Sequence, residues 1–455
     1  MSASAERPPV TRWLAERASA IRYEDLPDDA VTVARQCILD WFAVTLPGAA
    51  EPAVTILRDE LLEDGAAPIA SLVGSAERTS LVNAALINGT ASHAIDYDDV
   101  NMAILGHPTV AILPGLLALA ETRAASARDV ITAFVAGYDV ACRTGALMSP
   151  GHYQHGFHAT ATVGSVGAAA ACARLLGLDP GQSATAYGIS ATSAAGLKSM
   201  FGTMCKPLHA GHAARNGLQA ARLAARGFTS RQDALECAQG FAATQSVDFN
   251  PEAAMLDAPL DHHIRENLFK YHAACYLTHG AIEAGIALRR RHAVSSNAIE
   301  AIAMRVPPVA DRVCNLAAPR TGLEAKFSLR LTVAMALAGR DTAAITTYDD
   351  AVTRDPELVR LRDLATIEFD DSLPEAKAEI AIRTLDGARH VALHDAGVAD
   401  TDFARQGARL ETKFRALVGP VLGRVQAGEL VSALSSFGDG CTIGEIMAIA
   451  RGTPA

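Results

Sequence analysis

The sequence predicts a mainly α protein, in which a large all-helical domain is interrupted by a smaller α+β domain inserted before the C-terminal helices. Half of the 455 residues are hydrophobic and only 5% are aromatic, a composition that suits closely packed helices. Apolar residues recur at three- and four-residue spacing through most of the first 268 residues. The pattern changes after about Lys270, where short alternating segments begin, and becomes helical again from Thr401. A chain of this length is also expected to form two domains.

The N-terminal part is expected to consist of helices packed through small residues. In the first long helix, Val31, Ala34, Ile38, Trp41 and Phe42 share one face, with Asp28 and Asp29 as capping carboxylates and Pro47-Gly48 at its end. Further helices are expected at residues 79–93, 111–122, 127–147, 158–176, 182–197 and 210–225. The glycines at 164 and 167 suggest a phosphate loop, but no strand precedes them, so close helix packing is favoured.

The inserted domain is expected to contain a small sheet. Residues 298–306 and 378–384 alternate as half-buried strands, and Asp386-Gly387 is a turn that joins the second strand to residues 388–394 as a hairpin. Helices are expected at 325–337 and 343–352. We therefore assign residues 1–268 and 400–455 to the helical domain and residues 269–399 to the α+β domain.

Charge and cysteine usage exclude several classes of protein. The formal net charge of -10 argues against a nucleic-acid partner. The eight cysteines never form a CxxC pair, which disfavours zinc ribbons and iron–sulfur clusters and is typical of reduced thiols in the cytoplasm. The longest apolar run, at residues 110–120, is interrupted by Pro114 and too short to span a bilayer, and the N-terminus lacks the apolar core of a signal peptide. We expect a soluble cytoplasmic protein with no membrane partner.

The most unusual local sequence is a cluster of three carboxylates, Asp96, Asp98 and Asp99, which follows a predicted helix and precedes Gly106-His107-Pro108-Thr109. Crowded carboxylates repel one another, which raises the pKa of at least one of them and suits it to carrying a proton. A plain acidic loop or helix cap is equally consistent with this spacing. A calcium loop is not, since the required glycine and distant glutamate are absent.

Histidines are the second signal. His152, His155 and His158 are spaced by three, which permits a metal site, but no acidic residue or fourth ligand stands in register. His158 precedes a predicted helix, where backbone N–H groups and the helix dipole favour an anion, so we interpret it as part of an anion site.

Two lysines and a cysteine complete the candidates. Lys206 lies in an apolar, Gly- and His-rich stretch and is suited to holding a carboxylate, although most lysines are surface residues. Lys270 lies at the expected domain junction, where ligand clefts often form, or is an ordinary linker lysine. Cys275 has no base visible near it in sequence, which favours a buried structural thiol over a nucleophile.

Taken together, these motifs resemble the MmgE/PrpD family, which contains 2-methylcitrate dehydratases, cis-aconitate decarboxylase and iminodisuccinate epimerase. The resemblance covers nearly the whole chain. The matching stretches are SHAIDYDD at 92–99, GHPT at 106–109, and residues 137–145, 156–178, 206–230, 270–284 and 322–329.

The resemblance implies a homodimer that works without metal or other cofactor, with an α+β lid and an active site in the interdomain cleft. It implies site residues at the matching positions, which are Asp96, His107, His158, Lys206 and Lys270 and are expected to be catalytic. We also expect Asp99, His209 and Cys275 to bind the substrate. The chain also departs from the family pattern. Cys275 stands where cis-aconitate decarboxylases carry a histidine, Val100 stands where many members have Thr, and no tyrosine near Val313 matches the decarboxylases' lid tyrosine.

The resulting functional prediction is a metal-independent hydro-lyase that acts on a small di- or tricarboxylate such as 2-methylcitrate. Asp96 and His107 are expected to exchange protons with the substrate, His158 to bind a carboxylate or act as a second acid or base, and the two lysines to hold carboxylates. An iminodisuccinate-like epimerase, a cis-aconitate decarboxylase and a catalytically silent binding protein remain alternatives.

Overall fold

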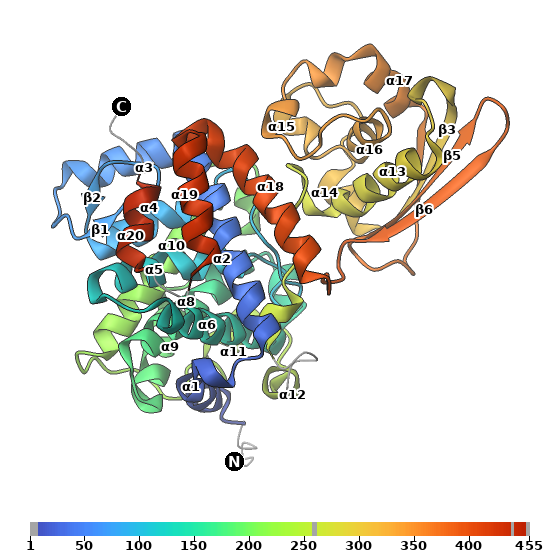
Figure 1. The fold of residues 1–455 in the computed structure, drawn as a ribbon. Coiled ribbons are helices and arrows are strands. Elements are labelled where there is room, and N and C mark those ends of the chain that lie inside the picture. Colours follow the sequence, from blue (N-terminus) through green and yellow to red (C-terminus); the bar gives the residue numbers. More distant parts are fainter. Residues whose placement is uncertain (1–7, 257–261, 438–440, 452–455) are drawn as a thin grey trace, which may run out of the picture. The chain divides into compact units, whose positions relative to one another are not determined.

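The computed structural model describes residues 8–256, 262–437 and 441–451. They fall into two compact units, one formed by Met1–Phe269 with Thr401–Ala455 and the other by Lys270–Asp400. In the first unit, the C-terminal helices (red in Figure 1) lie beside N-terminal ones (blue). Most of the described residues are helical and the strands are few, so the predicted mainly α class is confirmed.

Where the structure describes the first unit, its regular elements are helices apart from one small antiparallel pair of strands, β1 (Ala70–Ser71) and β2 (Arg78–Thr79). From the N-terminal segment come α1 (Val10–Ala20), α2 (Asp28–Gly48), α3 (Pro52–Glu63), α4 (Leu81–His93), α5 (Pro108–Arg123), α6 (Ala127–Met148), α7 (Gly151–Gln154), α8 (Ala159–Leu176), α9 (Pro180–Ser193), α10 (Cys205–Ala224), α11 (Phe241–Gln245) and α12 (Pro251–Met255). The C-terminal segment adds α18 (Phe403–Leu422), α19 (Arg424–Ser435) and α20 (Ile443–Ala450).

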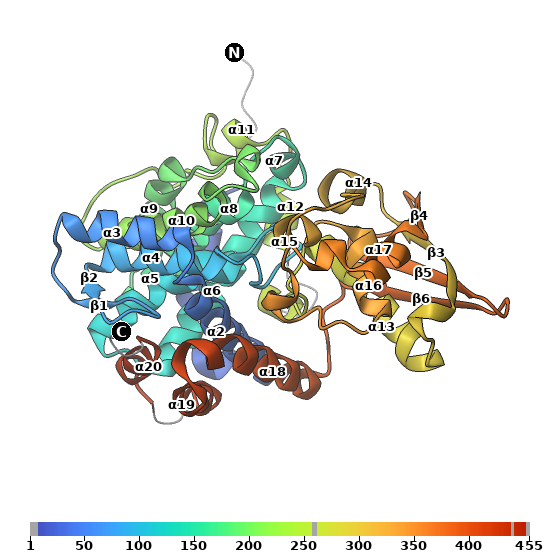
Figure 2. The same cartoon turned by 90° about the horizontal axis from the view of Figure 1, so that it is seen from above.

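Helix α8 lies at the centre of this unit, packed against α5, α6, α9 and α10 (Figure 2). Small residues permit this packing: a Cβ added at Gly137 of α6 would lie 2.6 Å from the Gly167 carbonyl oxygen of α8. The interpretation of the Gly164–Ala171 stretch as a helix-packing surface is therefore confirmed. Helices α6 and α8 are long and apolar enough to cross a bilayer, but 94% and 83% of these segments are buried inside the protein, as expected of core helices.

The second unit combines a four-stranded sheet with helices. Its strands are β3 (Ile299–Val306), β4 (Ala365–Phe369), β5 (Lys377–Thr384) and β6 (Arg389–Asp395), in the order β4-β3-β5-β6. Only the β3–β4 pair is parallel. The helices are α13 (His279–His292), α14 (Val309–Cys314), α15 (Gly322–Ala325), α16 (Leu329–Leu337) and α17 (Pro356–Asp363), and α13 packs against β5, β6 and α16. The predicted hairpin around Asp386-Gly387 is confirmed.

Several predicted boundaries are wrong. Residues 343–352 form a 3-10 turn at Ile345–Thr347 and the start of another at Val352, and the α-helix begins only at Pro356. Asp355 caps that helix by accepting from two backbone N–H groups, and proline is favoured at a first helical position. The predicted helix at 325–337 is divided in two, because Ser328 caps a new helix at Leu329.

Two helix starts also differ from expectation. Helix α2 begins at Asp28, so Asp28 and Asp29 lie in its first turn instead of capping it, where their charges favour the helix dipole. Helix α10 begins at Cys205, about one turn earlier than predicted, because a proline such as Pro207 is tolerated in the first turn. Lys206 therefore lies on a helix and not in a connecting loop.

Candidate active site

The candidate site is built around the loop that joins α4 to α5. His93 is the last residue of α4, and the backbone then turns through Asp96, whose φ of 52° lies in the left-handed region. Non-glycine residues seldom adopt this conformation, although aspartate tolerates it better than most. An antiparallel bridge between Asn101 and Gly106 closes the loop and returns the chain to His107, at the start of α5.

One buried carboxylate, that of Asp98, joins two histidines. It lies 2.9 Å from Nδ1 of His93 and 2.9 Å from Nδ1 of His107. Burial alone would raise the pKa of Asp98, but the charges and hydrogen bonds of the two imidazoles bring it well below its usual range. Burial also lowers the pKa of His93 to about 4, against the attraction of Asp98. At neutral pH, Asp98 is therefore ionised and His93 is neutral.

The side chain of the neighbouring Asp99 lies in a different environment. Its carboxylate accepts a hydrogen bond from the Thr109 hydroxyl and interacts with the Cys37 thiol of α2, and the residue is only 1% exposed. Burial raises the pKa of Asp99 to about 8, with smaller contributions from Asp40 and Asp98. One carboxylate of the cluster thus has a raised pKa as predicted, but burial contributes more than crowding.

Asp96 forms an ion pair with Lys206 of α10, with 2.8 Å between Oδ1 and Nζ. The two side chains are 29% and 17% exposed, so this pair is accessible, unlike Asp98. The Lys206 ammonium also lies 5.4 Å from the centre of the Phe201 ring.

His158 and His209 bring two more imidazoles to the same place. His158 is the N-cap residue of α8, and its Nδ1 lies 3.0 Å from Nδ1 of His209 on α10, so one nitrogen donates and the other accepts. The His158 ring stacks on His93 at 5.8 Å, and His93 lies 4.7 Å from His107. Burial, and then the neighbouring imidazoles and the Lys206 ammonium, lower the pKa of His158 well below its usual range. We call His93, His107, His158 and His209 the histidine cluster.

Comparisons with known proteins identify the family. The MmgE/PrpD N-terminal domain model matches residues 12–254, and the MmgE/PrpD C-terminal domain model matches residues 272–435. This chain belongs to the MmgE/PrpD family.

Curated relatives include cis-aconitate decarboxylases. The Homo sapiens protein is 29% identical over 375 residues, which cover 78% of this chain and 76% of the relative. The Mus musculus protein is 28% identical over 383 residues, with 78% and 75% covered. The Aspergillus terreus (strain NIH 2624 / FGSC A1156) protein is 29% identical over 297 residues, with 62% and 61% covered.

The anion site expected at the N-terminus of α8 needs correction. In this MmgE/PrpD protein, the Gly106 backbone packs onto that helix end, since a Cβ there would lie 3.0 Å from the Thr160 nitrogen. The His107 N–H also donates to the Thr160 hydroxyl at 3.1 Å. The first turn of α8 is thus covered by the chain itself, and anion binding here would have to use side chains.

The spacing of His152, His155 and His158 does not produce a metal site. His152 is held by the fold: its Nδ1 lies 3.0 Å from the Gln245 carbonyl oxygen and its Nε2 lies 2.7 Å from the Thr162 hydroxyl. The trio that does come together is His93, Asp98 and His107, whose donor atoms lie within 4.8 Å of one another. Nδ1 of His107 also faces the Asp99 carbonyl oxygen at 2.7 Å, so this nitrogen carries a hydrogen and is not free to bind a metal.

Lys270 and Cys275 belong to the second unit and are described within it. Lys270 is 1% exposed, which makes an ordinary linker lysine the wrong interpretation. Cys275 is buried, its N–H donates to the Lys326 carbonyl oxygen at 2.9 Å, and its thiol is hydrogen-bonded to that of Cys314. Its surroundings agree with a buried structural thiol.

Of the residues predicted from the sequence, Asp96, His107, His158, Lys206 and His209 converge in the first unit, while Asp99 turns into its core. His93 and Asp98 were not among the predicted site residues, although both lie in the same stretch at 92–99. The available signal was a histidine five residues before an aspartate in a loop. Spacing alone does not say which of three carboxylates faces the imidazoles.

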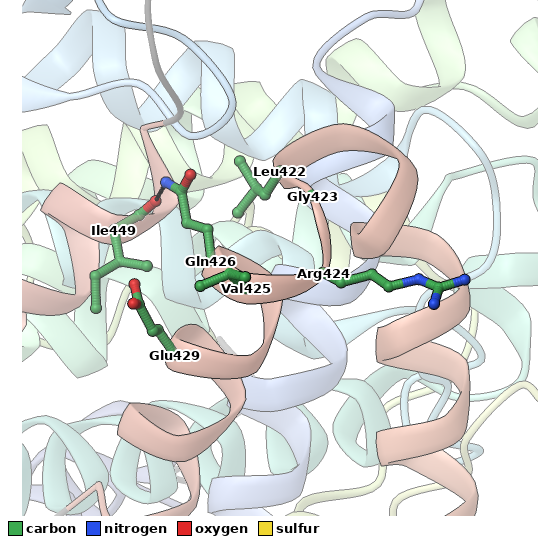
Figure 3. A pocket seen from close by; sticks show the side chains of 7 residues that line it. All are labelled: Leu422, Gly423, Arg424, Val425, Gln426, Glu429 and Ile449. Carbon is green, nitrogen blue, oxygen red and sulfur yellow. Dashed lines mark hydrogen bonds between the residues drawn. The ribbon is translucent and has the colours of Figure 1, made fainter.

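A separate hollow of about 400 Å³ lies among the C-terminal helices (Figure 3). Leu422, Gln426, Glu429 and Ile449 line it, and Gln426 donates to the Ile449 carbonyl oxygen at 2.7 Å. It holds no cluster of histidines or lysines, so the candidate active site is the histidine cluster with Asp98, Asp96 and Lys206.

Proposed function

We propose that this protein is a lyase that acts on a small tricarboxylate, with decarboxylation of cis-aconitate as the first reaction to test. The observation that carries this proposal is the convergence of Lys206 with the four imidazoles of the histidine cluster. The activity named for the curated relatives supports the same class of reaction.

The chemistry suits such a site. Loss of carbon dioxide from cis-aconitate breaks a carbon–carbon bond and leaves its electron pair in a dienolate, which a protein acid then protonates at carbon. The Lys206 ammonium can bind a carboxylate of the substrate. If that carboxylate takes the place of Asp96, the ammonium still has an anionic partner. Because Nδ1 of His107 carries a hydrogen, Nε2 is the atom that accepts or delivers the proton.

Dehydration of 2-methylcitrate is a second candidate. It would remove a proton beside a carboxylate, expel the hydroxyl group as water and use the same groups. The presence of Cys275, where cis-aconitate decarboxylases carry a histidine, favours it, because the thiol is engaged with Cys314 and does not replace an imidazole.

Proton NMR in heavy water tests the proposal directly. The purified protein is incubated separately with cis-aconitate, 2-methylcitrate, citrate and substituted succinates. New alkene signals with carbon dioxide release identify a decarboxylase, and new alkene signals with loss of the hydroxyl-bearing carbon identify a dehydratase. Deuterium incorporation without elimination would instead indicate an epimerase and contradict the proposal. A His107→Gln variant, in which the proton carrier is removed, serves as the negative control.

We also propose that the protein acts as a homodimer without metal or other cofactor. Light scattering after size-exclusion chromatography measures the oligomeric state. Full activity after dialysis against a chelator is the expected result, and loss of activity that is restored by a divalent metal would contradict it.

A further inference from the structure

We propose that Asp98 is a positioning residue that stabilises the proton carried by His107, and that His93 holds Asp98 in place. This inference rests on the proposed function, because it assigns a partner to the proton carrier of that reaction. His93 and Asp98 both lie in the stretch at 92–99, and the inference gives each of them a specific role.

The contacts of His107 determine which of its nitrogens carries the hydrogen. Its Nδ1 lies 2.9 Å from Oδ2 of Asp98 and 2.7 Å from the carbonyl oxygen of Asp99. Both partners only accept, so the hydrogen of the imidazole is on Nδ1 and Nε2 has a lone pair whenever the ring is neutral. When Nε2 takes a proton, the resulting imidazolium is already hydrogen-bonded to a carboxylate. An anion in this position lowers the cost of that charge.

The Asp98 carboxylate is in turn held by His93. The side chain is almost fully buried, and its oxygens lie 3.0 and 2.9 Å from Nδ1 of His93. A buried carboxylate needs partners, and among the described residues the partners of Asp98 are the two imidazoles of His93 and His107. The low pKa of Asp98 and the neutral state of His93 agree with this arrangement.

His93 packs beside the rings of His107 and His158, and its side-chain hydrogen bond among the described residues is the one to Asp98. It is 1% exposed, and its Nε2 has no hydrogen-bond partner among the described residues. A buried histidine that leaves one nitrogen unpaired is costly to retain for packing alone. The hydrogen bond from Nδ1 of His93 to Asp98 explains why a histidine is present here, since that bond directs the carboxylate toward His107.

The first experiment measures the tautomers of the wild-type protein by ¹⁵N NMR of labelled histidine, with His107→Gln and His93→Asn used to assign the two signals. We expect both imidazoles in the form with hydrogen on Nδ1. A His107 ring with its hydrogen on Nε2 would overturn the inference. This result needs no substrate, so it separates failure of the inference from failure of the proposed function, which would appear as inactivity on every substrate in the panel.

The second experiment replaces the charge of Asp98 with a group of the same shape. Asp98→Asn is expected to lower kcat by about 100-fold or more with little change in KM, as when the carboxylate behind a catalytic histidine is lost. Glu236→Gln is the matched control, because Glu236 is also a buried carboxylate but is hydrogen-bonded to Thr11, away from the cluster. Equal kcat in Asp98→Asn and the wild type would overturn the inference.

The third experiment distinguishes positioning from packing at His93. An asparagine amide can donate to Asp98 from nearly the place of Nδ1, whereas leucine fills the space without a donor. We expect His93→Asn to retain at least about tenfold more kcat than His93→Leu, in line with a hydrogen bond to a charged group. Better activity in His93→Leu would show that His93 serves packing alone.

Discussion

Lys206 and Asp96 are 110 residues apart in the sequence, yet Nζ and Oδ1 lie 2.8 Å apart. The lysine lies in the first turn of α10, and the aspartate occupies a left-handed backbone position after α4. Helices α4 and α10 pack closely along their length, which brings the two residues together. Backbone strain at a residue that pairs with an accessible lysine is typical of functional sites.

Replacing Lys206 with methionine is expected to raise KM for a tricarboxylate by about 10- to 100-fold, because a hydrogen bond to a charged group contributes about 1.5–3 kcal/mol. The matched control is Lys198→Met, since Lys198 lies over the Tyr153 ring and donates to the Tyr153 carbonyl oxygen. Steady-state kinetics of both variants are the measurement. An equal rise in KM for both would contradict a specific role for Lys206.

The raised pKa of Asp99 predicts that the stability of the folded protein depends on pH. This pKa is about 8 in the folded protein, above the unfolded value, so the folded state binds more protons and stability falls as pH rises toward 8. His93, with its pKa lowered to about 4, acts in the opposite direction, but only below about pH 6.5. Between pH 6.5 and 8, urea denaturation should therefore show wild type losing stability relative to Asp99→Asn. Parallel curves for the two proteins over this range would contradict the raised pKa.

The buried ion pair between Lys413 of α18 and Asp40 of α2, with 2.6 Å between nitrogen and oxygen, links the C-terminal segment to the N-terminal helices. Lys413→Met is expected to destabilise the protein by about 3–5 kcal/mol, because it removes the cation that faces a buried carboxylate. Adding Asp40→Leu to that variant should restore part of the loss. Denaturant titrations of the single and double variants measure this, and a double variant less stable than Lys413→Met would contradict the pairing.

Helix packing through glycine is tested by Gly137→Ala. A Cβ at this position would meet the Gly167 carbonyl oxygen and the Ala171 Cβ, both at 2.6 Å, so we expect a loss of about 1–3 kcal/mol from overpacking. Gly428→Ala in α19 is the control, because nothing lies within 4 Å of its added Cβ. That substitution should be neutral or stabilise the protein by up to about 1 kcal/mol. Melting temperatures that fall equally would contradict the packing argument.

The helix and strand patterns were largely predictable because they depend on local spacing. The alternation at 378–384 and the turn at Asp386-Gly387 correspond to β5, the hairpin and β6. The failures occurred where capping decides the outcome, as at Asp355, because an acidic residue before a proline competes with the weak helical pattern that precedes it. Starts and ends of helices depend on one or two hydrogen bonds and are correspondingly hard to predict.

The sequence predicted which residues form the candidate site better than it predicted which of them pair with one another. His107, His158 and Lys206 were singled out by their neighbours in sequence, and they lie near one another. The sequence did not reveal that Asp96 pairs with a lysine, Asp98 with two imidazoles and Asp99 with Thr109. The three carboxylates are nearly adjacent, and each points to a different element.

The mainly α class, the small-residue packing of the helices, the hairpin and the family could therefore all be predicted from the sequence. The tertiary structure decided which carboxylate is accessible, which is ionised and which is neutral. Periodicity acts over a few residues, whereas burial and charge pairing depend on groups from α2, α5 and α10, most of them distant in sequence. Asp98 and Asp99 are consecutive residues, yet the pKa of one lies well below its usual range and that of the other is about 8.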